Sequence, residues 1–221
     1  GRVPAEDYTG AARPSGSGVD RGAYEFGAAA ALPVVAALTS SASGQSNSLA
    51  PGSLMTLYGR GLANSTASAQ ALPLPVSLGG VQVLFGDVAA GLVYVSDVQV
   101  NLLAPDLPPG SSTTLTVVRG SARSAPSQLA VVAVAPAVFE IPLGSETRGA
   151  VTDAMGGVIT AANPAAPGAV LVAYATGLGA SDPAAGLPGL RESRIRPVVV
   201  VGGRQAVIQF AGPNPNFPGL D

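Results

Sequence analysis

Ala50-Pro51-Gly52-Ser53-Leu54-Met55-Thr56-Leu57-Tyr58-Gly59-Arg60-Gly61-Leu62-Ala63 is one of two related stretches in this chain. The other is Ala166-Pro167-Gly168-Ala169-Val170-Leu171-Val172-Ala173-Tyr174-Ala175-Thr176-Gly177-Leu178-Gly179, and a single offset of 116 residues aligns the two. Each copy has a Pro-Gly turn, an apolar strand and a Gly-Leu break. A repeat of this length fits a small β-domain better than a solenoid unit. We therefore predict two tandem β-modules with a binding, spacer or assembly role.

The composition supports an all-β protein with room for two small domains. The chain has 221 residues, of which 47% are hydrophobic, enough to build a core. Its 29 glycines and 20 prolines show no Gly-X-Y period, which excludes collagen. Scattered among short Val-rich runs, they predict many short strands joined by turns, as in β-sandwiches.

Missing residue types exclude several kinds of chemistry. The chain has no Cys and no His, so it lacks disulfides, thiolate nucleophiles, the usual zinc ligands and the commonest general base. All basic residues are Arg, which we attribute to a GC-rich genome rather than to anion recognition. The formal net charge of −2 argues against general nucleic-acid binding.

The order of segments predicts four regions. Residues 1–27 differ in composition from the rest, residues 28–48 are a linker, residues 49–135 form module 1 and residues 136–221 form module 2. No apolar run reaches the roughly 20 residues needed to cross a membrane, so we expect no membrane insertion. No signal peptide begins the sequence, and we expect the chain to be a piece of a longer protein.

Alternation of apolar and polar residues locates the strands. Module 1 is expected to contain strands at 53–58, 81–85, 89–96, 99–104, 113–119 and 128–134, and the run 32–38 is a possible edge strand. Module 2 is expected to contain strands at 149–152, 158–161, 169–175, 197–201 and 205–210. Further strands, among them those at 89–96, 99–104 and 113–119, follow Phe85 in module 1, whereas none follows Phe210. Module 2 should therefore have an unfilled place in its sheet, by truncation or, less favoured, with a neighbour's strand such as Leu32–Leu38 filling it.

Two family resemblances follow from ordered motifs. Residues 49–221 resemble a C-terminal module of secreted acidobacterial proteins first noted in Solibacter. The resemblance is carried by Ala50-Pro51-Gly52-Ser53, Leu72-Pro73-Leu74-Pro75, Val93-Tyr94-Val95-Ser96, Ala135-Pro136-Ala137-Val138-Phe139, Asn163-Pro164-Ala165 and Phe210-Ala211-Gly212. Asp87 departs from it, since Asn or Gly is commoner there. Members are similar to tandem immunoglobulin-like domains of the IPT/TIG kind, which implies a fold and an extracellular or bacterial cell-surface location more than an activity.

Residues 1–27 resemble the closing segment of secreted right-handed parallel β-helix proteins. Asp7-Tyr8-Thr9-Gly10, Arg13-Pro14 and Asp20-Arg21-Gly22-Ala23-Tyr24-Glu25 carry this resemblance in order. It implies that any β-helix active site lies upstream of this chain. An Asx- and Gly-rich loop is the alternative.

For each candidate site residue, a structural role is favoured over a catalytic or binding one. Ser53 has no nucleophile elbow and no His to activate it. The glycines at 59–61 and 177–179 favour turns over nucleotide loops. The loop carboxylates Asp97, Asp106, Asp153 and Asp182 lack calcium-loop spacing, and Arg191, Arg194 and Arg196 with Glu192 favour a solvated loop. For Tyr58 and Tyr174 we expect buried rings rather than a sugar platform.

We therefore expect no catalytic, cofactor or metal residue and no enzymatic activity. The expected fold class is all-β, with a β-helix remnant and two tandem immunoglobulin-like sandwiches, the second incomplete. The expected function is a non-catalytic extracellular accessory module that spaces, anchors or assembles a larger protein. The alternative is a carbohydrate-binding module attached to a polysaccharide-active β-helix enzyme. Expected partners are other domains of the same protein, with a surface glycan or a neighbouring strand as further candidates.

Overall fold

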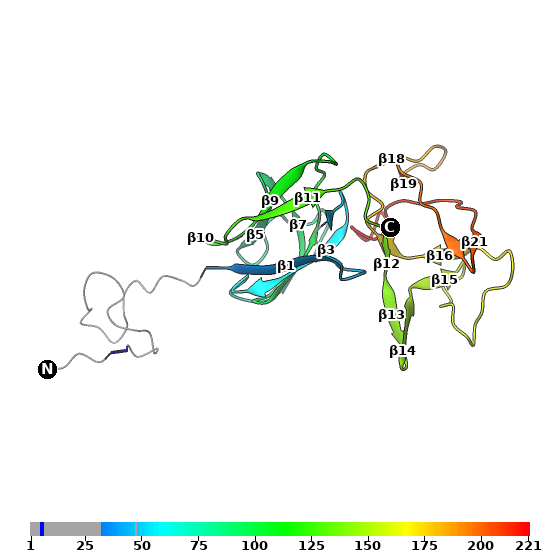
Figure 1. Ribbon diagram of the computed structural model, residues 1–221, viewed down its shortest axis with the longest axis horizontal. Coiled ribbons are helices and arrows are strands. Elements are labelled where there is room, and N and C mark those ends of the chain that lie inside the picture. Colours follow the sequence, from blue (N-terminus) through cyan, green and yellow to red (C-terminus); the bar gives the residue numbers. More distant parts are fainter. Residues whose placement is uncertain (1–4, 7–31, 47) are drawn as a thin grey trace. The chain divides into compact units, whose positions relative to one another are not determined.

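A computed structural model describes residues 5–6, 32–46 and 48–221 (Figure 1). The chain divides into two compact units, Gly1–Leu32 and Pro33–Asp221, and the description below concerns the second. The proposed β-helix remnant at 1–27 falls almost wholly outside the described residues. In the part of the chain that is described, no helix is long and apolar enough to cross a membrane.

Residues 34–131 form two β-sheets whose strands are mostly antiparallel (Figure 1). The first sheet has five strands in the order β1 (Val34–Ser40), β3 (Leu54–Arg60), β8 (Gln99–Leu103), β7 (Gly91–Val95) and β4 (Ala67–Ser68). The second has the order β2 (Ser48–Leu49), β11 (Ser127–Val131), β9 (Ser112–Arg119), β5 (Val81–Phe85) and β6 (Val88–Ala89), with β10 (Ala122–Arg123) paired to β9. All pairs are antiparallel except β2 with β11, which is parallel.

The core lies between these sheets because each strand turns every second side chain inward. Along β5, Val81, Val83 and Phe85 are at most 1% exposed, whereas Gln82 and Leu84 are half-buried. Complete burial of such a side chain contributes about 1.5–3 kcal/mol. The same cluster contains Leu49, Met55, Leu57, Leu62, Leu92, Val95, Val100, Leu102, Leu115 and Val117.

Several strands of module 1 were predicted closely, and the module boundary was not. The strand at 81–85 has the predicted limits, and those predicted at 53–58, 99–104 and 113–119 shift by one or two residues. The strand predicted at 89–96 is interrupted at Ala90, between β6 and β7. Val34–Ser40, assigned to the linker with only an edge strand as a possibility, pairs with β3 as β1. The sandwich therefore begins before residue 49.

Residues 137–205 contain only two-stranded sheets in the described chain. The pairs are β12 (Ala137–Val138) with β17 (Ala175–Thr176), β13 (Glu140–Leu143) with β14 (Glu146–Gly149), β15 (Val151–Asp153) with β16 (Leu171–Ala173), β18 (Ser181–Pro183) with β19 (Arg191–Ser193), and β20 (Val200–Val201) with β21 (Arg204–Gln205). The strands expected at 169–175 and 197–201 are present in shortened form, whereas the one expected at 158–161 is reduced to an isolated bridge at Val158 and the one at 205–210 is strand only at Gln205. These pairs do not pack as two sheets around a core. Apolar side chains such as Val201 at 61% and Val207 at 91% remain exposed.

The repeated turns nevertheless have the same backbone in both halves. Gly52 and Gly168 have positive φ angles of 73° and 83°, and the residue after each donates its N–H to the alanine carbonyl three residues earlier. The Gly79-Gly80 pair has φ angles of 57° and 77°, and Gly202-Gly203 has 57° and 78°. Consecutive positive φ angles suit a two-residue hairpin turn, which glycine adopts without strain. Neither copy of the repeated strand is helical, as predicted.

Candidate functional site

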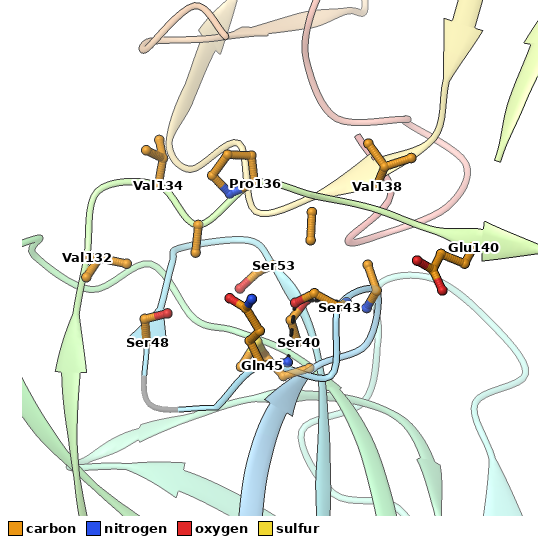
Figure 2. Close-up of a pocket in the computed structure, with 14 residues that line it drawn as sticks. Ser40, Ser43, Gln45, Ser48, Ser53, Val132, Val134, Pro136, Val138 and Glu140 are labelled. Carbon is orange, nitrogen blue, oxygen red and sulfur yellow. Dashed lines mark hydrogen bonds between the residues drawn. The ribbon is translucent and has the colours of Figure 1, made fainter. Parts of the chain in front are cut away.

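A polar hollow lies between the sandwich and the segment that leaves it (Figure 2). It has a volume of about 540 Å³. Ser40 at the end of β1, Ser48 in β2 and Ser53 before β3 line one side. Figure 2 shows Val134 and Pro136 on the opposite wall, with Glu140 at its rim.

Ser40 and Ser43 hold the turn that follows β1, and Ser53 holds the turn that precedes β3. Ser40 Oγ accepts hydrogen bonds from the N–H groups of Ala42 and Ser43 at 3.3 and 3.4 Å. Ser43 Oγ accepts from Gln45 at 3.3 Å. Ser53 Oγ donates to the Ala50 carbonyl at 2.6 Å. The pocket therefore offers hydrogen-bonding groups but no nucleophile paired with a base.

Ser53 thus has the structural role expected of it. Ser53 donates both its hydroxyl and its N–H to the Ala50 carbonyl, and these two bonds close the Pro-Gly turn that precedes β3. Its side chain is 3% exposed.

A second candidate surface is the outer face of β3, β8 and β7, which we call the tyrosine–amide face. Its members are Tyr58, Tyr94, Gln99 and Asn101. Tyr58 pairs with Gln99 and Tyr94 with Asn101, so all four side chains share the face opposite Val100 and Leu102 of the core. Gln99 Nε2 donates to Asn101 Oδ1 at 2.8 Å. Standard sheet spacings separate the two tyrosine Cα atoms by about 12 Å.

The exposure of Tyr58 corrects a sequence prediction. Its ring was expected to be buried, but the residue is 45% exposed. Tyr94, Gln99, Asn101 and Tyr174 are half-buried. Sequence reasoning singled out Tyr58 but missed its neighbours on this face, because the grouping depends on cross-strand register. The alternation Gln99-Val100-Asn101-Leu102 was the only local signal that β8 turns its amides outward.

The predicted loop carboxylates serve separate turns. Asp97 Oδ1 accepts the Gly61 N–H at 3.0 Å. Asp153 Oδ1 accepts the N–H groups of Met155 and Gly157 at 2.8 and 2.9 Å. Asp106 is exposed in the loop after β8. Across residues 5–6, 32–46 and 48–221, no three acidic side chains gather closely enough to hold a metal ion.

The arginine cluster is tied to its own hairpin, β18–β19. Arg194 forms an ion pair with Asp182 at 2.9 Å, and both side chains are more than half exposed. The hydrogen bond from Arg194 holds the pKa of Asp182 below its ordinary value. Arg191 donates to Ser181 Oγ at 3.0 Å, and Arg196 donates to the Ile208 carbonyl at 2.5 Å. These partners agree with the expected solvated loop rather than with an anion site.

The side chain of Asp221 accepts a hydrogen bond at the second Gly-Leu break, Gly177-Leu178. Its Oδ2 accepts the Leu178 N–H at 2.8 Å. Burial raises the pKa of the Asp221 carboxyl, and the N–H groups of Leu178 and Gly177 partly oppose this rise. The sequence alone does not point to Asp221. Its likeness to Asp97 becomes visible only when the hydrogen bonds from the two Gly-Leu breaks to these carboxylates are known.

Comparison with known proteins identifies one part of the chain. Residues 37–131 match the family model of the IPT/TIG domain. This range covers nearly all of both large sheets, so the chain contains one IPT/TIG domain with an immunoglobulin-like sandwich fold. No curated protein matches the chain.

Proposed function

We propose that this IPT/TIG-containing chain is a non-catalytic extracellular module that spaces, anchors or assembles a larger secreted or bacterial surface protein. The proposal rests chiefly on how the sandwich holds the following segment. The Ala135 N–H donates to the Gly177 carbonyl at 2.9 Å, and the Leu54 N–H donates to Thr176 Oγ1 at 2.8 Å. These bonds involve main-chain groups at the ends of strands, which is the chemistry of a structural joint rather than of a reaction centre.

The proposal also includes a second immunoglobulin-like module, a preceding β-helix domain and an extracellular location. The shared Pro-Gly and Gly-Gly turns support residues 136–221 as a second, incomplete immunoglobulin-like module. The motifs in residues 1–27 support a preceding β-helix domain, which would place any polysaccharide chemistry upstream. The resemblance to secreted acidobacterial proteins supports the extracellular location.

Incubation with polysaccharides tests the non-catalytic part of the proposal. The full chain is mixed with pectin, alginate and xylan, and new reducing or unsaturated ends are measured. We expect none, because the hollow beside Ser53 lacks an acid–base pair, and Asp97, Asp153 and Asp182 each bind a different part of the backbone or an arginine. Turnover that persists after repurification would falsify the proposal.

A second candidate function is carbohydrate binding at the tyrosine–amide face. The specific observation is that Tyr58 and Tyr94 lie on one open sheet face with the amides of Gln99 and Asn101 between them. Aromatic faces stack on sugar rings and amides hydrogen-bond hydroxyls. The tyrosine spacing of about 12 Å exceeds one sugar ring, which favours a linear glycan.

Pull-down on insoluble polysaccharides tests this second candidate. Tyr58→Ala and Tyr94→Ala should each weaken binding by about tenfold, whereas Tyr58→Phe should retain it because the ring remains. Met155→Ala, at a residue 95% exposed in the second half, is the control for unrelated surface changes. Equal retention of wild type and Tyr58→Ala on every polysaccharide would remove the candidate.

A further inference from the structure

We propose that the open edge of β16 and β17 receives an antiparallel strand whose polar and apolar residues alternate as in β8. The inference deepens the proposed assembly role and rests on it, because it names the kind of segment that the second half accepts. Among the described residues, β16 is paired along one side only, with β15. The opposite side therefore presents main-chain groups that invite another strand.

The first half of the repeat shows what occupies the corresponding edge. There, β3 has β1 on one side and β8 on the other. Tyr58 pairs with Gln99 and Leu54 pairs with Leu103. Applying the repeat offset of 116 residues, the occupant's first residue should lie opposite Tyr174 and its fifth opposite Val170.

The ladder along this edge has already begun at Asp221. The N–H of Ala175 donates to the Asp221 carbonyl at 3.0 Å, and the N–H of Asp221 donates back to Ala175 at 2.7 Å. In the first half, Gly59 is the equivalent of Ala175, and its N–H donates to Val98 immediately before β8. Asp221 therefore stands where a strand equivalent to β8 starts.

A carboxylate contacts the Gly-Leu break in both halves, although the ladder bonds align Asp221 with Val98 rather than with Asp97. Asp97 accepts from Gly61 through its side chain and from Leu62 through its carbonyl. Asp221 accepts from Leu178 through its side chain. In the first half the carboxylate lies two residues before β8, so the contact of Asp221 with Leu178 marks a comparable place beside the second break.

Exposed apolar side chains show that the second half lacks a cover. Met55 and Leu171 are equivalent by the repeat offset, yet Met55 is 2% exposed and Leu171 is 36% exposed. Phe85 and Phe210 each follow a Gly-Gly turn, Phe85 at the end of β5 and Phe210 beyond the short β21, and they are 1% and 37% exposed. An occupant with apolar residues at every second position would cover this inner side while its polar residues faced outward.

The test adds such a strand where the ladder begins. A copy of residues 99–104, Gln-Val-Asn-Leu-Leu-Ala, is attached directly after Asp221 of the full chain, so that its first residue lies opposite Tyr174. We expect the amide protons of Leu171 and Ala173 to exchange at least about tenfold more slowly, because strand pairing protects main-chain N–H groups. The melting temperature should rise as well.

The matched control is a copy of the same length that carries Val100→Asp and Leu102→Asp. It should leave amide exchange at Leu171 and Ala173 unchanged, since its inward-facing residues are charged. The proposal is overturned if the unmodified copy and the control give the same exchange rates. It is also overturned if the unextended chain forms a dimer whose interface already protects these amides, because a second copy of the chain would then fill the edge.

This readout separates the inference from the proposed function. Amide exchange in the purified protein reports the open edge, whatever the protein anchors or spaces. Catalytic turnover on a polysaccharide would overturn the proposed function without changing the exchange result. Unchanged exchange with no turnover would overturn the strand acceptor alone.

Discussion

At the scale of single residues, the fold changes the acidity of Asp182 and Asp221 in opposite directions. Asp182 accepts hydrogen bonds from the Arg194 guanidinium, which stabilises its charged form and lowers its pKa. Asp221 is largely removed from water, which favours its neutral form and raises its pKa. The two carboxyls should therefore contribute to stability with opposite dependence on pH.

Carboxyl titration by NMR should show both shifts. Asp182 should titrate below its ordinary value of 3.8, so its contribution is present above pH 3.8 and lost as the pH falls through the folded pKa. Because this ion pair is exposed, the contribution should be small and weakened by salt. Asp221 should titrate above 3.8, so its contribution falls as the pH rises from 3.8 through the folded pKa.

Arg194→Gln provides the control for these titrations. It should return the pKa of Asp182 toward 3.8 and leave that of Asp221 in place, because Arg194 is not among the groups that shift Asp221. Titration of Asp182 above 3.8 in the unmodified protein would contradict the ion pair.

At the scale of strands, equivalent sequences in the two halves differ in how much they bury. The strand Val81–Phe85 lies between β9 and β6 and turns Val83 and Phe85 into the core. The segment at 206–210 follows a turn of the same backbone geometry but includes Val207 at 91% exposure. The two halves therefore have similar strand sequences, but among the described residues only the first half has a second sheet that packs against those strands and completes a core.

Paired alanine substitutions measure this difference. Phe85→Ala should destabilise the protein by about 3–5 kcal/mol, because it removes a fully buried ring and leaves a cavity. Phe210→Ala should cost less than about 1 kcal/mol, because the ring already meets water. Urea unfolding followed by circular dichroism gives both values. Equal losses for the two variants would show that Phe210 is buried in solution.

The limits of prediction also lie at this scale. Period-2 alternation located the strand at 81–85 correctly, since its inward residues meet a well-packed opposite sheet. The same alternation could not reveal the missing core around Leu171, because burial depends on distant segments. The Ser-rich stretch at 40–48 obscured β1, and Tyr94 joined Tyr58 only through the register across β8. Ser53 bonds Ala50 within its own turn, as its sequence context suggested, whereas Asp97 finds Gly61 36 residues away and Asp153 and Asp182 lie in strands rather than in loops.

At the scale of the whole molecule, a buried threonine joins the sandwich to the second half. Thr176 is 0% exposed, and its Oγ1 accepts the N–H of Leu54 at the start of β3. Gly177 follows with a φ of 87°, and a side chain at this position would meet the Ala135 carbonyl. The joint thus depends on one hydroxyl and on close approach of two backbones.

Thr176→Val should loosen this joint. It leaves the Leu54 N–H without its acceptor and should cost about 1–3 kcal/mol. Limited proteolysis within 136–221 should accelerate, and the Leu54 amide should exchange faster. Thr176→Ser keeps the hydroxyl and should retain most of the protection. If Thr176→Val and Thr176→Ser behave alike, the hydroxyl does not hold the joint.

The parallel pairing of β2 with β11 has a mechanical consequence. Ser48 and Leu49 pair with Ala130 and Val131, and the Val132 N–H donates to the Leu49 carbonyl at 2.9 Å. Because β2 and β11 run in the same direction, a force applied at the start of β2 and at the end of β11 pulls the two strands past each other. Their hydrogen bonds are then loaded together in shear instead of being unzipped singly. This pair should therefore resist stretching along its own direction better than an antiparallel hairpin of the same length.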